Sequence, residues 1–193
     1  FFRANRFALK EAEVFWLSDT PDVAGSNQWG GACVRIAAVV VLIDRTDGTS
    51  IGICNAHMDH VSAVAREKGA RLIRERLPSY GSNLKWVVMG DFNATPGSVP
   101  YQALVGAEPG RITLTDTYAT LYPNAAPEVG SFHGYTGKIS EGRIDWILVS
   151  PEFTPLAGAI NQLKYRDMYP SDHLAVWADL KHVAARIPTL RQD

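Results

Sequence analysis

A short apolar run that ends in an acidic and an amide side chain is the feature that most constrains this chain. The apolar residues Trp86 to Met89 lead directly into Gly90-Asp91-Phe92-Asn93, and a Pro/Gly-rich loop follows. Because side chains alternate along extended backbone, Asp91 and Asn93 share one face while Phe92 packs on the other. The pattern predicts a buried strand that delivers a carboxylate and an amide to one point. The alternative is an Asx-type turn, in which both side chains bond to nearby backbone.

Three other segments repeat this arrangement of a hydrophobic strand joined to polar residues. The polar residues that share a face or a strand end are Asn55, His57 and Asp59 in segment 51–60, Arg143 and Asp145 in segment 142–150, and Ser171, Asp172 and His173 before the apolar run 174–177. A single buried Asp or His is more often structural than catalytic. Four strand ends with the same chemistry favour a functional site.

The remaining pattern predicts an α/β fold. Strand-like runs cover 33–43, 51–57, 86–89 and 144–149, and turn signals separate them. A long helix is expected at 61–77 and a shorter one at 99–105. In the long helix, an apolar stripe consists of Val61, Ala65, Gly69 and Leu72, whereas the residues off the stripe, expected to face solvent, are Arg66, Arg71, Arg74 and Glu75.

Composition predicts one soluble domain over residues 1–193. With 193 residues, of which 46% are hydrophobic, the chain can bury one core, and the polar tail 184–193 is expected to fray. The 19 basic and 20 acidic side chains nearly cancel, so no general attraction to nucleic acid is expected. No apolar run reaches the roughly eighteen residues of a transmembrane segment. A cytoplasmic and a secreted location both remain open. Cys33 and Cys54 neither require nor exclude a disulfide.

Four motifs taken together resemble the endonuclease/exonuclease/phosphatase superfamily, which includes DNase I, exonuclease III-type repair nucleases and sphingomyelinases. The motifs are Asn55 to His60, Gly90 to Asn93, Gly142 to Ile147 and Ser171 to His173. The resemblance implies a four-layer α/β sandwich of the DNase I-like type, in which two facing mixed β-sheets are flanked by helices. The polar strand ends are then expected to converge at one edge.

The chain departs from the family pattern at its beginning. Family members start with a strand that carries an Asn and then present a metal-binding Glu, and no segment here matches that part. Phe1 to Phe7 resembles a strand from the middle of a family domain, while Glu11 and Glu13 lie too far along to replace the Glu. The resemblance therefore implies an N-terminally incomplete domain, whose metal site is completed by a missing segment or by a second polypeptide.

The resemblance also implies roles for the catalytic residues. Asp91 would activate the attacking water, and Asn93 would hold that water and a phosphate oxygen. His173 would contact the phosphate, with Asp145 fixing its tautomer, and His57 would stabilise or protonate the leaving group. Asp172 would bind the metal together with Asp91 and Asn93. Hard oxygen ligands without a Cys/His cluster favour Mg²⁺ or Mn²⁺ over zinc.

Three further residues are expected to contact the substrate. Arg35 resembles the phosphate-contacting arginine of the family, with a surface ion pair as its alternative. Asp59 would support His57 or reach the metal. His133 would line the substrate edge, with a structural place in its turn as the alternative, and His60 is expected to be structural or solvated.

The sequence thus predicts a metal-dependent phosphoesterase that hydrolyses a phosphodiester or a phosphomonoester. Two alternatives are kept. The first is a truncated or degenerate family member that serves as a scaffold or subunit, because the metal-binding Glu has no match. The second is a lipid-directed phosphodiesterase similar to sphingomyelinases, which requires an exposed apolar hairpin. The sequence offers no clear candidate for such a hairpin.

Overall fold

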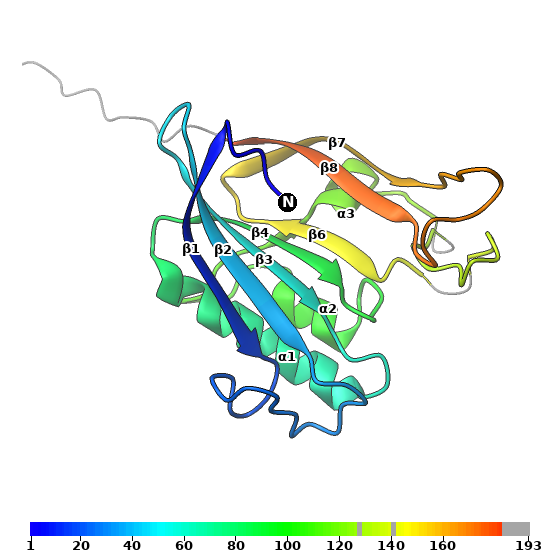
Figure 1. Cartoon of the computed structure of the whole chain (residues 1–193), viewed down its shortest axis with the longest axis horizontal. Helices are drawn as coiled ribbons and strands as arrows, with labels where there is room; N and C mark the ends of the chain where they lie inside the picture. Colours follow the sequence, from blue (N-terminus) through cyan, green and yellow to red (C-terminus); the bar gives the residue numbers. More distant parts are fainter. Residues whose placement is uncertain (127–128, 140–141, 183–193) are drawn as a thin grey trace, which may run out of the picture.

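A six-stranded mixed sheet forms the centre of the computed structural model, which describes residues 1–126, 129–139 and 142–182 (Figure 1). The strand order is β1-β2-β3-β4-β6-β5. The strands of this sheet are β1 (Phe7–Trp16), β2 (Ile36–Asp44), β3 (Ser50–His57), β4 (Lys85–Asp91), β5 (Thr115–Asp116) and β6 (Asp145–Val149). Among the strands of the described residues, only β3 and β4 pair in parallel, and the connection between them runs through a helix.

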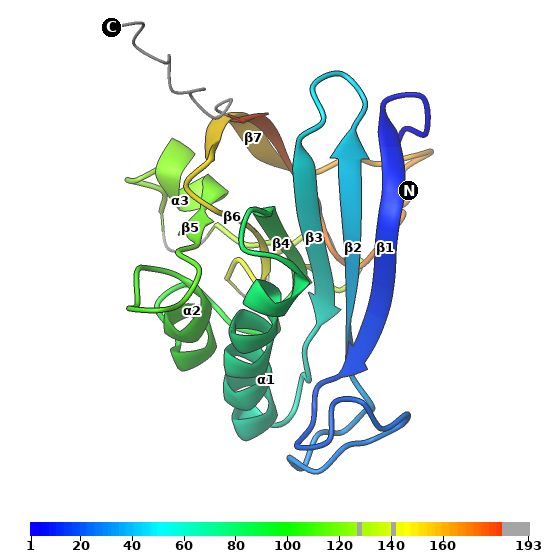
Figure 2. The ribbon, with the colours of Figure 1, turned by 90° about the vertical axis from the view of Figure 1, so that its left-hand side faces the viewer.

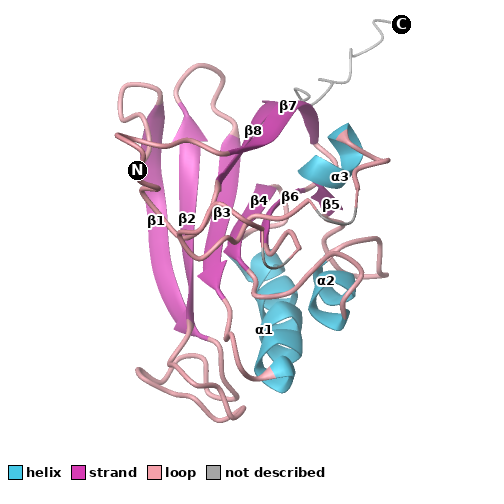
Figure 3. Cartoon of the chain, turned by 90° about the vertical axis from the view of Figure 1, so that its right-hand side faces the viewer, coloured by secondary structure: helices cyan, strands magenta, loops and turns pink. Residues whose placement is uncertain are grey.

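A second sheet and three helices flank the central sheet. The antiparallel strands β7 (Phe153–Asn161) and β8 (Ala175–His182) form the second sheet, and β8 contacts β6. The helices α1 (Ala63–Arg76) and α2 (Val99–Leu104) pack side by side on the central sheet (Figures 2 and 3). The short helix α3 (Thr117–Leu121) contacts β7 and β6. This is the DNase I-like arrangement of sheets and helices that the motifs predict.

Alternation along the central strands divides the core between the two faces of the sheet. Trp86 and Val88 of β4 belong to the large cluster that includes Ile73 of α1. The intervening Val87 packs in a second cluster with Leu180 of β8. Both faces of β4 are therefore covered, which accounts for its uninterrupted apolar run.

The long helix is shorter than predicted and buries one of its arginines. Ser62 caps α1 by accepting from the Ala65 N–H, so Val61 lies before the helix and is 63% exposed. A 3₁₀ helix, η1 (Leu77–Tyr80), follows α1 and has a proline in its first turn. Arg74 was expected in solvent but is 3% exposed. Its guanidinium donates to the backbone carbonyls of Ala103, Gly106 and Ile112, and these acceptors let a charged side chain be buried.

Several other boundaries differ from the prediction. The first strand is Phe7–Trp16, so the expected strand at residues 1–7 is wrong. β2 begins at Ile36, which leaves Cys33 in an exposed loop, whereas Cys54 is buried, and both are free thiols. The tail 184–193 lies outside the described residues. Within the described part of the chain, no helix combines the length and apolar character needed to cross a membrane.

Candidate active site

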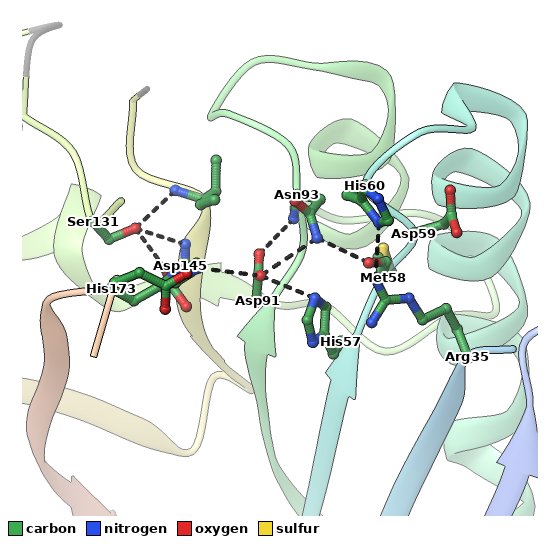
Figure 4. Close-up of polar contacts among 12 residues, drawn as sticks. Arg35, His57, Met58, Asp59, His60, Asp91, Asn93, Ser131, Asp145 and His173 are labelled. Atoms are coloured by element: carbon green, nitrogen blue, oxygen red, sulfur yellow. Dashed lines mark hydrogen bonds and ion pairs between the residues drawn. The ribbon is translucent and has the colours of Figure 1, made fainter. Parts of the chain in front are cut away.

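The register of the central sheet sets three polar residues in one row. His57 at the end of β3 pairs with Asp91 of β4, and Asp91 pairs with Asp145 of β6. Paired residues on neighbouring strands project from the same face, so the three side chains converge (Figure 4). A cavity of about 270 Å³ lies beside Asp91 and Asp145, between the central sheet and the start of β8.

Gly90 permits this convergence. Its φ of +140° is rarely adopted by residues with a side chain, and a Cβ atom there would lie 1.9 Å from the Ala56 carbonyl oxygen of β3. The next residues continue the contact between strands, because the Met58 N–H donates to the Asp91 carbonyl. Phe92 is fully buried and stacks on Trp146 at 4.4 Å, as the alternation in this segment predicts.

The carboxylate of Asp91 lies between two imidazoles. Its Oδ2 atom is 3.2 Å from His57 Nε2 and 3.7 Å from His173 Nε2. Its Oδ1 atom accepts from the Asn93 backbone N–H. The side-chain amide N–H of Asn93 donates to the Met58 carbonyl at 2.9 Å, and the same nitrogen makes only a 3.4 Å contact to Asp91 Oδ2. Asn93 itself has a φ of +48°, so the chain turns sharply at this point.

A second carboxylate anchors His173. Asp145 Oδ2 lies 2.8 Å from His173 Nδ1, and the same oxygen accepts a 2.6 Å hydrogen bond from the Ser131 hydroxyl. His173 reaches this position because Phe132 and His173 form an antiparallel bridge next to the start of β8. Asp172 precedes His173, and its carbonyl accepts from the N–H groups of His133 and Gly134.

Burial and charge push the pKa values of the two imidazoles in opposite directions. Burial lowers the pKa of His57, and the charges of Arg35 and His173 lower it further. The charge of Asp91 acts to raise it but does not outweigh them. Burial alone would also lower the pKa of His173. The hydrogen bond and charge of Asp145, together with the charge of Asp91, outweigh burial and raise the pKa of His173. Burial raises the pKa of Asp145, although its hydrogen bonds favour the charged form.

Arg35 lies at the same edge of the sheet as the row. Its Nη2 atom is 3.2 Å from His60 Nδ1, and its charge acts on His57. Figure 4 shows the guanidinium of Arg35 beside His57 and His60. The contact of Arg35 with a substrate anion stays a prediction. His60, expected to be structural or solvated, is an exposed partner of Arg35.

The structure corrects the expectation for Asp59. Strand β3 ends at His57, so alternation no longer holds two residues later, and the Asp59 carboxylate is buried away from the row. It accepts from the backbone N–H groups of Val61, Ser62 and Cys33. Burial works to raise its pKa, but these hydrogen bonds outweigh burial and lower it. Asp59 thus organises the loop before α1, and a role of Asp59 at the substrate stays a prediction.

His133 also has a structural place. Its side chain is 1% exposed, its Nδ1 atom accepts from the Gly137 N–H, and its ring packs on Tyr169 at 4.4 Å. These contacts hold the turn that follows Ser131. These contacts fit the alternative of a structural place in the turn, and contact of His133 with a substrate stays a prediction.

The predicted metal ligands Asp91, Asn93 and Asp172 offer hard oxygen atoms, which fits Mg²⁺ or Mn²⁺. They provide at most three protein ligand groups, fewer than the roughly six oxygens that Mg²⁺ takes. A separate group of potential ligands, Asp44, Asp47 and His182, lies at the other end of β2 among the described residues. Arg6 already donates to Asp44, and Lys85 contacts His182. Cationic side chains therefore already bind two of these three potential ligands.

Comparison with known proteins identifies the family. The Endonuclease/Exonuclease/phosphatase family matches residues 14–173, so the chain belongs to this family, whose members include phosphatases and nucleases. A mannosyl-6-phosphatase from Bacteroides thetaiotaomicron is similar, with 30% identity over 93% of this chain and 69% of its own, and a TM-score of 0.79. A family member from Bacteroides vulgatus has 28% identity over 94% and 69% of the two chains, also with a TM-score of 0.79.

More distant structures share the fold alone. The catalytic domain of human Nocturnin, with a bound sulfate anion, is 20% identical over 94% of this chain and 62% of its own, with a TM-score of 0.73. A comparison with curated protein sequences gave no match. The chain spans about two thirds of the Bacteroides structures, so part of each has no counterpart among these residues.

Sequence reasoning missed one residue of the site. Ser131 lies in the segment Ser131 to Gly134, in which the sequence indicated only His133 as a site residue. Its fully buried hydroxyl contacts Asp145, 14 residues away. A serine carries no sequence signal for such a contact unless the fold is known.

Proposed function

We propose that this chain hydrolyses a phosphoester with the help of Mg²⁺ or Mn²⁺. The observation that carries the proposal is the position of the Asp91 carboxylate between His57 and His173, with His173 anchored by Asp145. Membership of a family of phosphatases and nucleases supports the same reaction class. A carboxylate flanked by two imidazoles supplies the proton acceptor and the proton donors that hydrolysis at phosphorus requires.

Each residue of the row then has a distinct role. Asp91 orients the attacking water and takes its proton. One amide N–H of Asn93 is committed to the Met58 carbonyl, while the other makes only a long contact and is available to a phosphate oxygen. His173, held at Nδ1 by Asp145, contacts the phosphate through its Nε2 side. His57, whose side chain is 56% exposed, donates a proton to the leaving oxygen, and Arg35 neutralises phosphate charge.

The metal would be held by Asp172, Asp91 and Asn93. A bound divalent ion polarises the phosphoryl oxygen and stabilises developing charge. Water, the substrate phosphate and a further polypeptide segment would provide the remaining ligands. Such a segment would fit over β1 to β3 on the face opposite α1, where Val14, Ala38 and Asn55 form one row and Val14 is 43% exposed. A further segment of the same polypeptide or a second polypeptide would supply it.

Sugar phosphates are the first substrates to test. The relative named as a mannosyl-6-phosphatase matches 93% of this chain at 30% identity. Phosphodiesters form the second class, because nucleases belong to the same family. Both classes share the phosphoryl group that the row would bind, and they differ in the leaving group.

A hydrolysis assay of the purified chain tests the proposal. Mannose 6-phosphate and bis(p-nitrophenyl) phosphate are incubated with Mg²⁺, with Mn²⁺ or with EDTA. The expected result is metal-dependent hydrolysis that falls by at least about a hundredfold in Asp91→Ala, since loss of one catalytic group commonly costs that much. Asp19→Asn is the matched control, because Asp19 forms only an exposed pair with Lys68. Asp19→Asn should retain the wild-type rate.

Hydrolysis that resists EDTA, or equal rates in wild type and Asp91→Ala, would contradict the proposal. No hydrolysis with either metal, in this chain and in a longer form containing the completing segment, would favour the scaffold alternative.

One observation supports a lipid-directed phosphodiesterase as a second candidate. In the connection between β7 and β8, Leu163, Tyr165 and Met168 are each more than 60% exposed, and Tyr165 and Met168 form an antiparallel bridge. This small hairpin is the exposed apolar feature that a membrane-directed relative requires, and no signal in the sequence distinguished it. Cosedimentation with sphingomyelin vesicles tests it. Binding lost in Tyr165→Ser would support this candidate, and equal recovery with and without vesicles would contradict it.

A further inference from the structure

Ser131 connects the two sides of the Asp145–His173 pair. It contacts Asp145 through its side chain and the residue after His173 through its backbone. Its side chain is fully buried, and its Oγ atom lies 2.6 Å from Asp145 Oδ2. Its backbone carbonyl accepts a 2.7 Å hydrogen bond from the N–H of Leu174, the residue after His173. One residue thus links the start of β6, which carries Asp145, to the start of β8, which follows His173.

The direction of the Ser131 hydroxyl bond follows from its other contacts. The Oγ atom also accepts from the backbone N–H groups of Ile144 and Asp145, each at 3.1 Å. A hydroxyl has two acceptor positions and one proton. Two N–H donors fill the acceptor positions, so the single proton must go to the Asp145 carboxylate. Among the described residues, no other acceptor hydrogen-bonds to this hydroxyl.

This bond determines which carboxylate oxygen faces His173. Asp145 Oδ2 receives both the Ser131 hydroxyl and His173 Nδ1. The two donors fix the rotation of the carboxylate, and an ionised oxygen in that position requires a proton on Nδ1 of the imidazole. The Nε2 atom of His173 is then directed toward Asp91, at 3.7 Å.

We propose that Ser131 is a positioning residue that holds Asp145 and His173 in the arrangement needed for phosphoester hydrolysis. Its effect on turnover rests on the proposed function, whereas its effect on His173 does not. Ser131 does not touch the substrate. It acts by fixing the Asp145 carboxylate, which in turn fixes the orientation and tautomer of the imidazole.

Three serine variants test the proposal. Ser131→Ala removes the hydroxyl, and Ser131→Thr keeps it. Ser150→Ala is the matched control, because Ser150 is a buried serine whose Oγ atom accepts from the Trp86 N–H, outside the Asp145–His173 contact. Unfolding midpoints measured by circular dichroism show whether each variant is folded at the temperature of the assay.

Proton NMR of ¹⁵N-labelled protein gives the first measurement and needs no turnover. Wild type should show a strongly downfield Nδ1 proton on His173, assigned by its loss in His173→Gln. Ser131→Ala should lose this signal or shift it upfield, whereas Ser131→Thr and Ser150→Ala should retain it. An unchanged His173 signal in folded Ser131→Ala would overturn the proposal.

Kinetics with a phosphoester and Mg²⁺ give the second measurement. Ser131→Ala should lower kcat about 10- to 100-fold, as is typical when a residue that orients a site ligand is lost, with little change in KM. Ser131→Thr should restore most of kcat. A Ser131→Ala kcat equal to that of Ser150→Ala would overturn the catalytic part. If wild type hydrolyses nothing, with and without the completing segment, while Ser131→Ala loses the His173 signal, the proposed function fails and the positioning of His173 by Ser131 stands.

Discussion

Replacing Asp116 with Ala should lower the free energy of unfolding by roughly 4–6 kcal/mol. Asp116 and Arg143 form a buried ion pair with a 2.6 Å contact, and their side chains are 2% and 6% exposed. Asp116 also caps α3 through the N–H groups of Tyr118 and Ala119. Loss of the carboxylate leaves a buried guanidinium without its ion-pair partner, which costs about 3–5 kcal/mol. It also removes a helix cap worth about 1 kcal/mol.

The assay is urea unfolding followed by tryptophan fluorescence, since the chain has five tryptophans. Asp116→Ala, Arg143→Met and the double variant form a double-mutant cycle. The double variant should be at least about 2 kcal/mol more stable than Asp116→Ala, because it no longer buries an unpaired charge. Glu67→Ala is the control, because the pair of Glu67 with Arg71 is exposed and should contribute less than about 0.5 kcal/mol. A loss below about 1.5 kcal/mol in Asp116→Ala would refute the reasoning.

Two further predictions concern the sheet and the dependence on acid. Gly90→Ala should destabilise the chain by more than about 3 kcal/mol or prevent folding, because its Cβ would lie 1.9 Å from the Ala56 carbonyl; a urea midpoint near wild type would contradict this. The hydrogen bonds from Thr46, opposed by burial and assisted by Arg6, lower the pKa of Asp44 to about 2. A lowered folded-state pKa stabilises the fold above the ordinary value near 3.8, and this contribution disappears as the pH falls toward 2. The stability difference between wild type and Asp44→Asn should therefore be constant above about pH 5 and shrink below pH 4 in acid-titrated urea melts. A difference independent of pH would contradict the assignment.

The short-range pattern of the sequence predicted the polar residues that form the row of the candidate site. His57, Asp91 and Asp145 each stand at or next to the end of a strand-like run, and alternation predicted the face on which they project. Their pairing in one register follows from the fold of the family that the motifs resemble. Alternation also predicted that Phe92 is buried.

Other outcomes depended on contacts between distant segments. Arg143 shares a strand pattern with Asp145, yet its guanidinium turns to Asp116, 27 residues away. Arg74 lies off the apolar stripe of α1, but it is buried where it donates to the carbonyls of Ala103 and Ile112, 29 and 38 residues away. Asp59 was assigned to a strand face although the strand ends two residues earlier. Local periodicity carries no information on such partners.

Hydrolysis in H₂¹⁸O tests the central claim most directly. The chain, or its longer form, is incubated with a phosphomonoester and Mg²⁺, and the products are analysed by mass spectrometry. Attack at phosphorus by water that Asp91 activates predicts one ¹⁸O atom in the released phosphate, none in the alcohol, and no labelled product with Asp91→Ala. Label in the alcohol, or labelled phosphate at an equal rate with Asp91→Ala, would contradict the account.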